Sequence, residues 1–139
     1  MIKIMNQSQI DRICFQYKKW YLEHFPLCGF CFHRVKEGEA DLTHIIRRSY
    51  SREMQMVKLN CCLAHRDCYQ IWDDNPEQAV YLPRIIEILY IVYLLDEKFF
   101  NLIAGNFVTI SDILQLFPGV ENREITHHGQ LLQLTYLYS

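Results

Sequence analysis

The chain carries no strong charge of either sign, no long hydrophobic run and no low-complexity tract. Its 14 lysines and arginines against 16 acidic residues give a formal net charge of −2, so no overall attraction to nucleic acid is expected and any polyanion site must be local. The longest apolar run, residues 85 to 95, contains Glu87 and is too short to span a bilayer. Half of the residues are apolar and 14% are aromatic, which is typical of a globular protein and argues against disorder.

The beginning of the sequence also lacks the pattern of a secretory signal, because polar and charged side chains interrupt residues 6 to 12. We therefore expect a soluble cytoplasmic protein with no membrane partner. In such a reducing compartment, the 6 cysteines are better explained as metal ligands than as disulfides. A length of 139 residues suits one domain, or one small domain with an appendage.

Two short ligand pairs stand out in the first half of the chain. Cys28 and Cys31 form a C-x2-C motif, and His65 and Cys68 form an H-x2-C motif. An x2 spacing lets both members of a pair chelate from one tight turn, so two pairs can complete a tetrahedral Zn²⁺ site. Zinc bound there would stabilise the fold directly. Cys62 is an alternative to His65 as the fourth ligand, and unmetallated core cysteines are the plainer interpretation of all four positions.

A different class of protein also uses this type of motif. The Cys28-Gly-Phe-Cys31 segment resembles the C-x-x-C of thiol–disulfide exchange proteins. That scaffold needs a βαβ unit that starts before the motif, whereas here an amphipathic helix and Pro26 precede it, and the second ligand pair stays unexplained. The remaining cysteines, Cys14 and Cys61, are expected to be small buried apolar residues.

Between the ligand pairs lie the run His44-Ile45-Ile46-Arg47-Arg48-Ser49 and then Asn60. With the flanking pairs, this order resembles the HNH endonuclease family over residues 26 to 75. The resemblance implies a zinc-stapled ββα-metal fold that acts on DNA, with His44 as general base on a water and Asn60 holding the histidine loop. It also implies one Mg²⁺ or Mn²⁺ that stabilises the leaving oxygen of the phosphodiester. Arg47 and Arg48 are candidate ligands for phosphate oxygens.

Two positions depart from the family pattern. The residue before the base and the residue after the last cysteine normally hold the divalent cation, and here they are Thr43 and Tyr69, which are poor ligands for a hard cation. Asp41 lies three residues before His44 and is expected on the other face of the strand. Three acidic residues further along are candidate replacements: Asp67, Asp73 and Asp74. Two functions are therefore considered, a metal-dependent endonuclease and a non-catalytic zinc domain that binds nucleic acid or a protein partner.

Hydrophobic periodicity predicts an α+β protein in three parts. Residues 1–25 form an amphipathic helix that starts with Ser8 as its N-cap. Residues 26–76 form the zinc-binding core, and residues 77–139 are mainly helical. Within the core, the expected elements are strands at 40–46 and 60–63, a loop at 47–58 and a short helix at 65–72.

In the last part, apolar residues cover most of the circumference of a helix expected at 84–104, with Gly105 as its stop. A helix that is apolar on all sides must be enclosed by its own chain or by a partner, so this helix is a candidate interface for a homo-oligomer or a protein partner. Three further expectations concern the C-terminal region: a short helix at 112–117 capped by Ser111, an exposed turn at His127 and His128, and a strand-like tail at 131–138.

Overall fold

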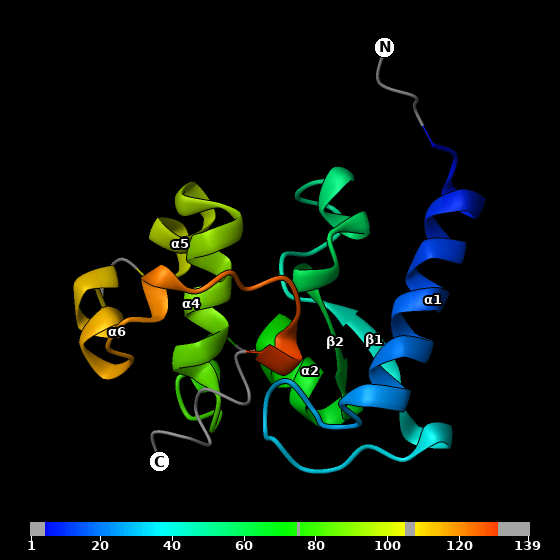
Figure 1. Cartoon of the computed structure of the whole chain (residues 1–139), viewed down its shortest axis with the longest axis horizontal. Helices are drawn as coiled ribbons and strands as arrows, with labels where there is room; N and C mark the ends of the chain where they lie inside the picture. Colours follow the sequence, from blue (N-terminus) through cyan, green and yellow to red (C-terminus); the bar gives the residue numbers. More distant parts are fainter. Residues whose placement is uncertain (1–4, 75, 105–107, 131–139) are drawn as a thin grey trace.

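A computed structural model describes residues 5–74, 76–104 and 108–130. It is a mixed α+β structure, mainly helical, as predicted from the sequence. Figure 1 shows helix α1 (Gln7–His24) along one side of a two-stranded sheet, and the helices of the C-terminal half on the other side of that sheet. No helix among these described residues is long and apolar enough to cross a membrane. The predicted stop at Gly105 and the predicted tail strand at 131–138 lie outside the described residues.

The central sheet consists of β1 (Asp41–His44) and β2 (Cys61–Ala64), which pair antiparallel. Each strand overlaps the predicted one. Helix α2 (Arg66–Asp74) follows β2 directly, so the chain order here is strand, strand, helix. The connection between the strands is less irregular than predicted, because it contains 3-10 turns at Glu53–Met56 and Lys58–Asn60. In this register His44, at the end of β1, lies opposite Cys61.

Two helices start two residues earlier than predicted. Ser8 and Ser111 lie inside α1 and α6 (Ile110–Leu116), and do not cap them. In both helices the cap and the third helical residue exchange hydrogen bonds in a capping box, formed by Asn6 with Gln9 and by Thr109 with Asp112. The reciprocal bonds satisfy backbone groups that the first turn leaves free, which explains why these positions take the cap.

The predicted continuous helix over 84–104 is wrong. After the short α3 (Pro76–Ala79), the chain forms α4 (Ile85–Leu95) and then a separate helix, α5 (Glu97–Ala104). Asp96 between them has an extended backbone with φ −160° and ψ 102°, and its carboxylate accepts the N–H of Phe99 at 3.0 Å. Aspartate is a favoured N-cap because its side chain replaces a missing backbone acceptor, so Asp96 ends one helix and begins the next.

The apolar surface of α4 is largely enclosed by the chain itself. Four of its side chains are at most 1% exposed, namely Ile88, Leu89, Ile91 and Val92. They belong to the same core cluster as the strand residues Cys62 and Leu63. The sequence allowed this helix to be enclosed either by its own chain or by a partner. Burial within the chain accounts for most of the length of α4.

The predicted exposed turn at His127 and His128 is also wrong, because His128 is only 3% exposed. Its backbone N–H donates to the Tyr21 hydroxyl at 3.0 Å. The His127 ring packs against Trp20 and Phe25, with ring centroids 4.7 and 5.5 Å apart. Burial, with a smaller effect of nearby positive charge, lowers the pKa of His128 to about 3. The two histidines therefore attach the segment after α6 to the C-terminal end of α1.

Candidate metal centre and adjacent groove

The Cys28–Cys31 turn packs directly on β2. The Gly29 N–H donates to the Leu63 carbonyl at 2.9 Å, and a Cβ added at Gly29 would lie 2.6 Å from the Cys62 Sγ. Only glycine therefore permits this close approach. Just after the turn, Phe32 has a left-handed backbone with φ 66°, and its N–H donates to the Cys28 carbonyl at 2.9 Å. These contacts present both cysteines of the turn towards the start of α2.

The structure brings the four predicted zinc ligands together. Their ligand atoms all lie within 4.8 Å of one another, and they belong to Cys28, Cys31, His65 and Cys68. A tetrahedral zinc site of this composition needs separations of about 3.6 to 3.8 Å between ligand atoms, so small side-chain movements would complete it. Cys62 does not belong to this group, and its thiol contacts Thr43 instead. The Cys3His cluster could hold a metal ion, and its donor set suits a structural zinc.

Hydrogen bonds around His65 orient its ring for metal binding. The His65 Nε2 lies 3.1 Å from the Arg34 carbonyl, and because a carbonyl only accepts, this nitrogen carries the proton. In the neutral ring, Nδ1 then has the free lone pair, and it lies 3.4 Å from the Cys31 Sγ. A histidine that binds metal through one ring nitrogen usually donates the N–H of its other nitrogen to a carbonyl or carboxylate, and this hydrogen bond fixes the orientation of the ring.

The thiols of the cluster are crowded and partly buried. Burial first, and then the neighbouring thiols of Cys28 and Cys31, raises the pKa of Cys68 above its ordinary value. A divalent cation has the opposite effect, because a coordinating thiol is deprotonated outright. A bound divalent cation would therefore relieve the crowding of these thiols, because it would stabilise them as thiolates.

The second feature of interest is His44 at the end of β1. Its Nε2 lies 3.2 Å from the Gln55 carbonyl and 3.7 Å from the Cys14 Sγ. Because the carbonyl must accept, Nε2 is the protonated nitrogen of the neutral ring, and Nδ1 keeps its lone pair. The ring is partly exposed and lines a groove.

Asn60 fixes the loop that holds His44. This side chain is fully buried, and its Oδ1 accepts the Ile46 N–H at 2.7 Å. Its Nδ2 donates to the Ile46 carbonyl and to the Met54 carbonyl, both at 3.0 Å. Met54 immediately precedes Gln55, so one amide connects the chain just after β1 to the turn whose carbonyl orients His44.

The groove beside His44 has a volume of about 640 Å³, and it is lined by residues of α1, β1 and α2 together with Arg48 from the connection after β1. Its charged lining consists of three basic side chains, Lys18, Arg48 and Arg66, and three acidic ones, Asp11, Asp41 and Asp74. Asp41 also lines the groove, together with the other residues of β1. Sequence reasoning missed Lys18 and Asp11, because no sequence pattern shows that α1 packs beside β1.

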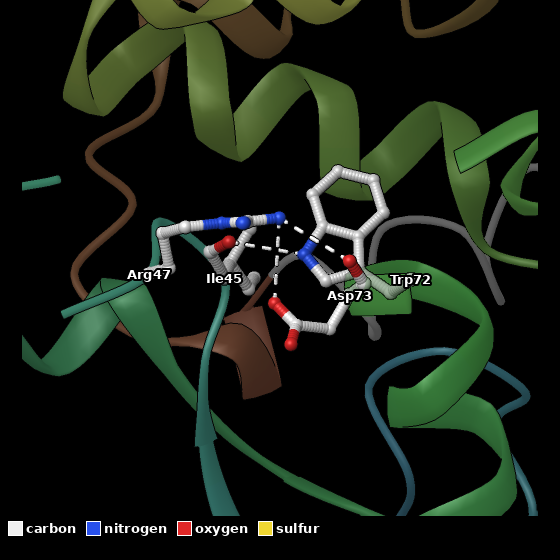
Figure 2. A network of polar contacts seen from close by, with 4 residues as sticks. All are labelled: Ile45, Arg47, Trp72 and Asp73. Carbon is white, nitrogen blue, oxygen red and sulfur yellow. Dashed lines mark hydrogen bonds and ion pairs between the residues drawn. The ribbon is translucent and has the colours of Figure 1, made fainter. Parts of the chain in front are cut away.

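Arg47 does not line the groove as Arg48 does. Figure 2 shows Arg47 beside Asp73 at the end of α2: its Nη2 donates to the Asp73 carbonyl at 3.2 Å and forms an ion pair with the Asp73 carboxylate at 3.5 Å. Next to it, the Trp72 Nε1–H donates to the Ile45 carbonyl at 3.0 Å. Of the two predicted phosphate ligands, only Arg48 therefore lines the groove, while Arg47 connects β1 to α2.

The side chains at the two positions expected to hold a divalent cation, Thr43 and Tyr69, suit one poorly. Thr43 is buried and donates its hydroxyl to the Cys62 carbonyl at 3.2 Å. Burial raises the pKa of Tyr69, so its phenol stays protonated and is a poor ligand for a hard cation. Within the described parts of the chain, the Cys3His cluster is the only group of three or more His, Cys, Asp and Glu side chains close enough to hold a metal ion. Of the three candidate replacements, Asp74 alone lines the groove.

No protein-family model matches this chain, and no match was found among curated proteins or solved structures. Inferences about function therefore depend on the residues of the metal cluster and of the groove.

Proposed function

We propose that the groove beside His44 binds the phosphodiester backbone of DNA, and that the chain is an HNH-type endonuclease built on a zinc-stapled ββα core. One observation carries the proposal. The Gln55 carbonyl accepts a hydrogen bond from the Nε2–H of His44, while the buried Asn60 holds the turn that supplies this carbonyl. The other ring nitrogen keeps its lone pair, and the ring lines an open groove.

This arrangement suits a general base. Hydrolysis of a phosphodiester requires a water that loses its proton as it attacks phosphorus. In the proposed reaction, the His44 Nδ1 takes that proton as the water oxygen bonds to phosphorus. The bond from phosphorus to the leaving sugar oxygen breaks, and that oxygen takes up a proton from solvent. The Gln55 carbonyl stabilises the imidazolium by accepting the hydrogen bond from its Nε2–H. Asn60 is a positioning residue, because it acts on the loop and does not touch the substrate.

The basic side chains of the groove supply a local site for an anion. Arg48 and Arg66 can each make two parallel hydrogen bonds to phosphate oxygens, and Lys18 adds a positive charge from α1. A chain with a net charge of −2 has no general attraction to DNA, so binding would depend on these three residues. The four-ligand cluster would hold a structural zinc at the other end of β2 and keep the sheet in place.

A second candidate function is binding of nucleic acid without cleavage. The observation that favours it is the poor fit of Thr43 and Tyr69 to a hard divalent cation, which this type of hydrolysis normally uses. In this case Arg48, Arg66 and Lys18 keep their role, and His44 contributes only a polar contact.

The test is cleavage of supercoiled plasmid DNA by the zinc-loaded protein with Mg²⁺ or Mn²⁺ added. His44→Gln is the sharpest variant, because its side chain can still donate an N–H to the Gln55 carbonyl but offers no base. His33→Ala is the matched control, since His33 is exposed and does not line the groove. Nicking by the wild type and by His33→Ala, but not by His44→Gln, would support the nuclease. Equal nicking by all three would exclude His44 as the base.

Binding is measured separately with a fluorescent DNA duplex. Arg48→Ala with Arg66→Ala is expected to weaken binding and to reduce its dependence on salt, because two phosphate contacts are lost. Arg123→Ala, an exposed arginine away from the groove, is the control. Binding that depends on the groove without any nicking would favour the second candidate. DNA binding that is unchanged in Arg48→Ala with Arg66→Ala would contradict both candidate functions.

A further inference from the structure

Three side chains from different parts of the chain converge on the Gln55 carbonyl. The Cys14 Sγ lies 3.3 Å from this oxygen, the Cys61 Sγ 3.8 Å, and the His44 Nε2 3.2 Å. The two sulfurs therefore lie against the same oxygen atom, one at 3.3 Å and the other at 3.8 Å. Cys14 belongs to α1 and Cys61 to β2, so this contact joins two elements that are distant in sequence.

The two cysteines differ in exposure. Cys61 is fully buried, as expected for a small apolar residue. Cys14 is instead partly exposed and lines the groove, which differs from the prediction that both are buried. A small molecule from solvent can therefore reach the Cys14 thiol, whereas the Cys61 thiol is shielded from solvent.

We propose that Cys14 and Cys61 are a redox-active thiol pair, which closes to a disulfide when a hydroperoxide enters the groove. This proposal is independent of the proposed nuclease activity, because it requires only the two sulfurs and access to one of them.

The chemistry takes two steps. The Cys14 thiolate attacks one peroxide oxygen and the O–O bond breaks, which leaves a sulfenic acid at Cys14. The departing oxygen takes up a proton and leaves as water from hydrogen peroxide, or as an alcohol from an organic hydroperoxide. The Cys61 sulfur then attacks the Cys14 sulfur, the S–O bond breaks, and a water leaves with the Cys61 proton. Two thiols have then lost two electrons and the peroxide has gained them.

The surroundings favour Cys14 as the attacking thiol. The hydrogen bond from Cys61 lowers the pKa of Cys14 below its ordinary value, and the neighbouring His44 acts in the same direction. The same hydrogen bond, together with burial, raises the pKa of Cys61, which suits the thiol that reacts second.

The other cysteines are less suited to this reaction. Three of them form the candidate metal cluster, namely Cys28, Cys31 and Cys68, where a bound cation would occupy their lone pairs. Cys62 is fully buried on the adjacent position of β2, and its sulfur contacts the Thr43 hydroxyl at 3.5 Å. Cys62 is therefore a matched internal control for Cys61.

The experiment is a non-reducing peptide map of the zinc-loaded protein after treatment with hydrogen peroxide. Free thiols are alkylated in guanidinium chloride before digestion with trypsin. Cys14 then lies in the fragment of residues 13–18, and Cys61 and Cys62 share the fragment of residues 59–66. The expected product is these two fragments joined, with a mass two hydrogens below their sum, and a matching loss of alkylated 13–18.

Cysteine-to-serine variants identify which cysteine of residues 59–66 forms the disulfide with Cys14. The linked product is expected in Cys62→Ser and absent in Cys61→Ser and Cys14→Ser. If Cys61→Ser does not fold, Cys14→Ser at its partly exposed position still tests the pair, because both cysteines of 59–66 should then stay alkylated. Linkage of 13–18 to a fragment of the metal cluster, linkage that survives in Cys61→Ser, or Cys14 oxidised with both cysteines of 59–66 free would overturn the proposal.

Discussion

Replacement of Asn60 by alanine is expected to lower the free energy of unfolding by about 4 kcal/mol. The Asn60 amide makes three hydrogen bonds, and two of them are to the backbone N–H and carbonyl of Ile46, which is fully buried. A buried polar group that loses its partner costs about 1 to 3 kcal/mol, so these two groups account for most of the effect. The third bond, to the Met54 carbonyl, is only partly buried and adds less.

The assay is urea unfolding of the zinc-loaded protein at pH 7, followed by circular dichroism. Asn101→Ala, at an exposed position on α5, is the control and should leave the unfolding free energy almost unchanged. Asn60→Asp sharpens the test, because a carboxylate can accept from the Ile46 N–H but faces two carbonyls without a proton to donate. Its destabilisation should be at least as large at pH 7 and smaller at acid pH, where the protonated carboxyl can donate. A loss of less than about 1 kcal/mol in Asn60→Ala would refute the reasoning.

Three further predictions concern other parts of the fold. Gly29→Ala should cost about 1 to 3 kcal/mol by overpacking against the Cys62 sulfur, whereas Gly38→Ala, with nothing within 4 Å of the added Cβ, should cost little, as judged from unfolding midpoints in urea. Asp96→Ala removes the N-cap of α5 and should cost about 1 kcal/mol in the same assay, and an unchanged midpoint would argue against this cap. Because the pKa of His128 falls from 6.5 to about 3 on folding, the unfolded chain binds a proton that the folded chain does not, so stability is lost as the pH drops from about 6.5 towards 3. His128→Phe should therefore lose less stability than the wild type over that pH range, and parallel curves would exclude His128 as the cause.

Features that depend on short-range spacing could be predicted from the sequence. The two ligand pairs come together as their x2 spacing indicates, and both strands and α2 lie close to their predicted positions. Hydrophobic periodicity also located the apolar helix α4, but it could not show the break at Asp96. Apolar residues continue on both sides of this position, so periodicity predicts one helix, whereas the capping of Phe99 by the Asp96 side chain divides it into two.

Features that depend on packing between distant elements could not be predicted. Lys18 and Cys14 reach the groove only because α1 lies beside β1, and no local pattern in α1 indicates that neighbour. The same limit explains His128, which belongs to no sequence motif and was expected in an exposed turn, but whose backbone N–H donates to the Tyr21 hydroxyl across 107 positions of sequence. Arg47 and Arg48 are adjacent and equally basic, yet Arg47 pairs with Asp73 while Arg48 lines the groove, and no local pattern distinguishes the two positions.

The proposed core requires one metal ion held by Cys28, Cys31, His65 and Cys68. The decisive measurement is the metal content of protein purified without added zinc, by inductively coupled plasma mass spectrometry, beside Cys68→Ser and Cys62→Ser. We predict one zinc per chain in the wild type and in Cys62→Ser, and a clear loss in Cys68→Ser. Less than half an equivalent of zinc in the wild type, or as much zinc in Cys68→Ser as in the wild type, would contradict the predicted zinc site.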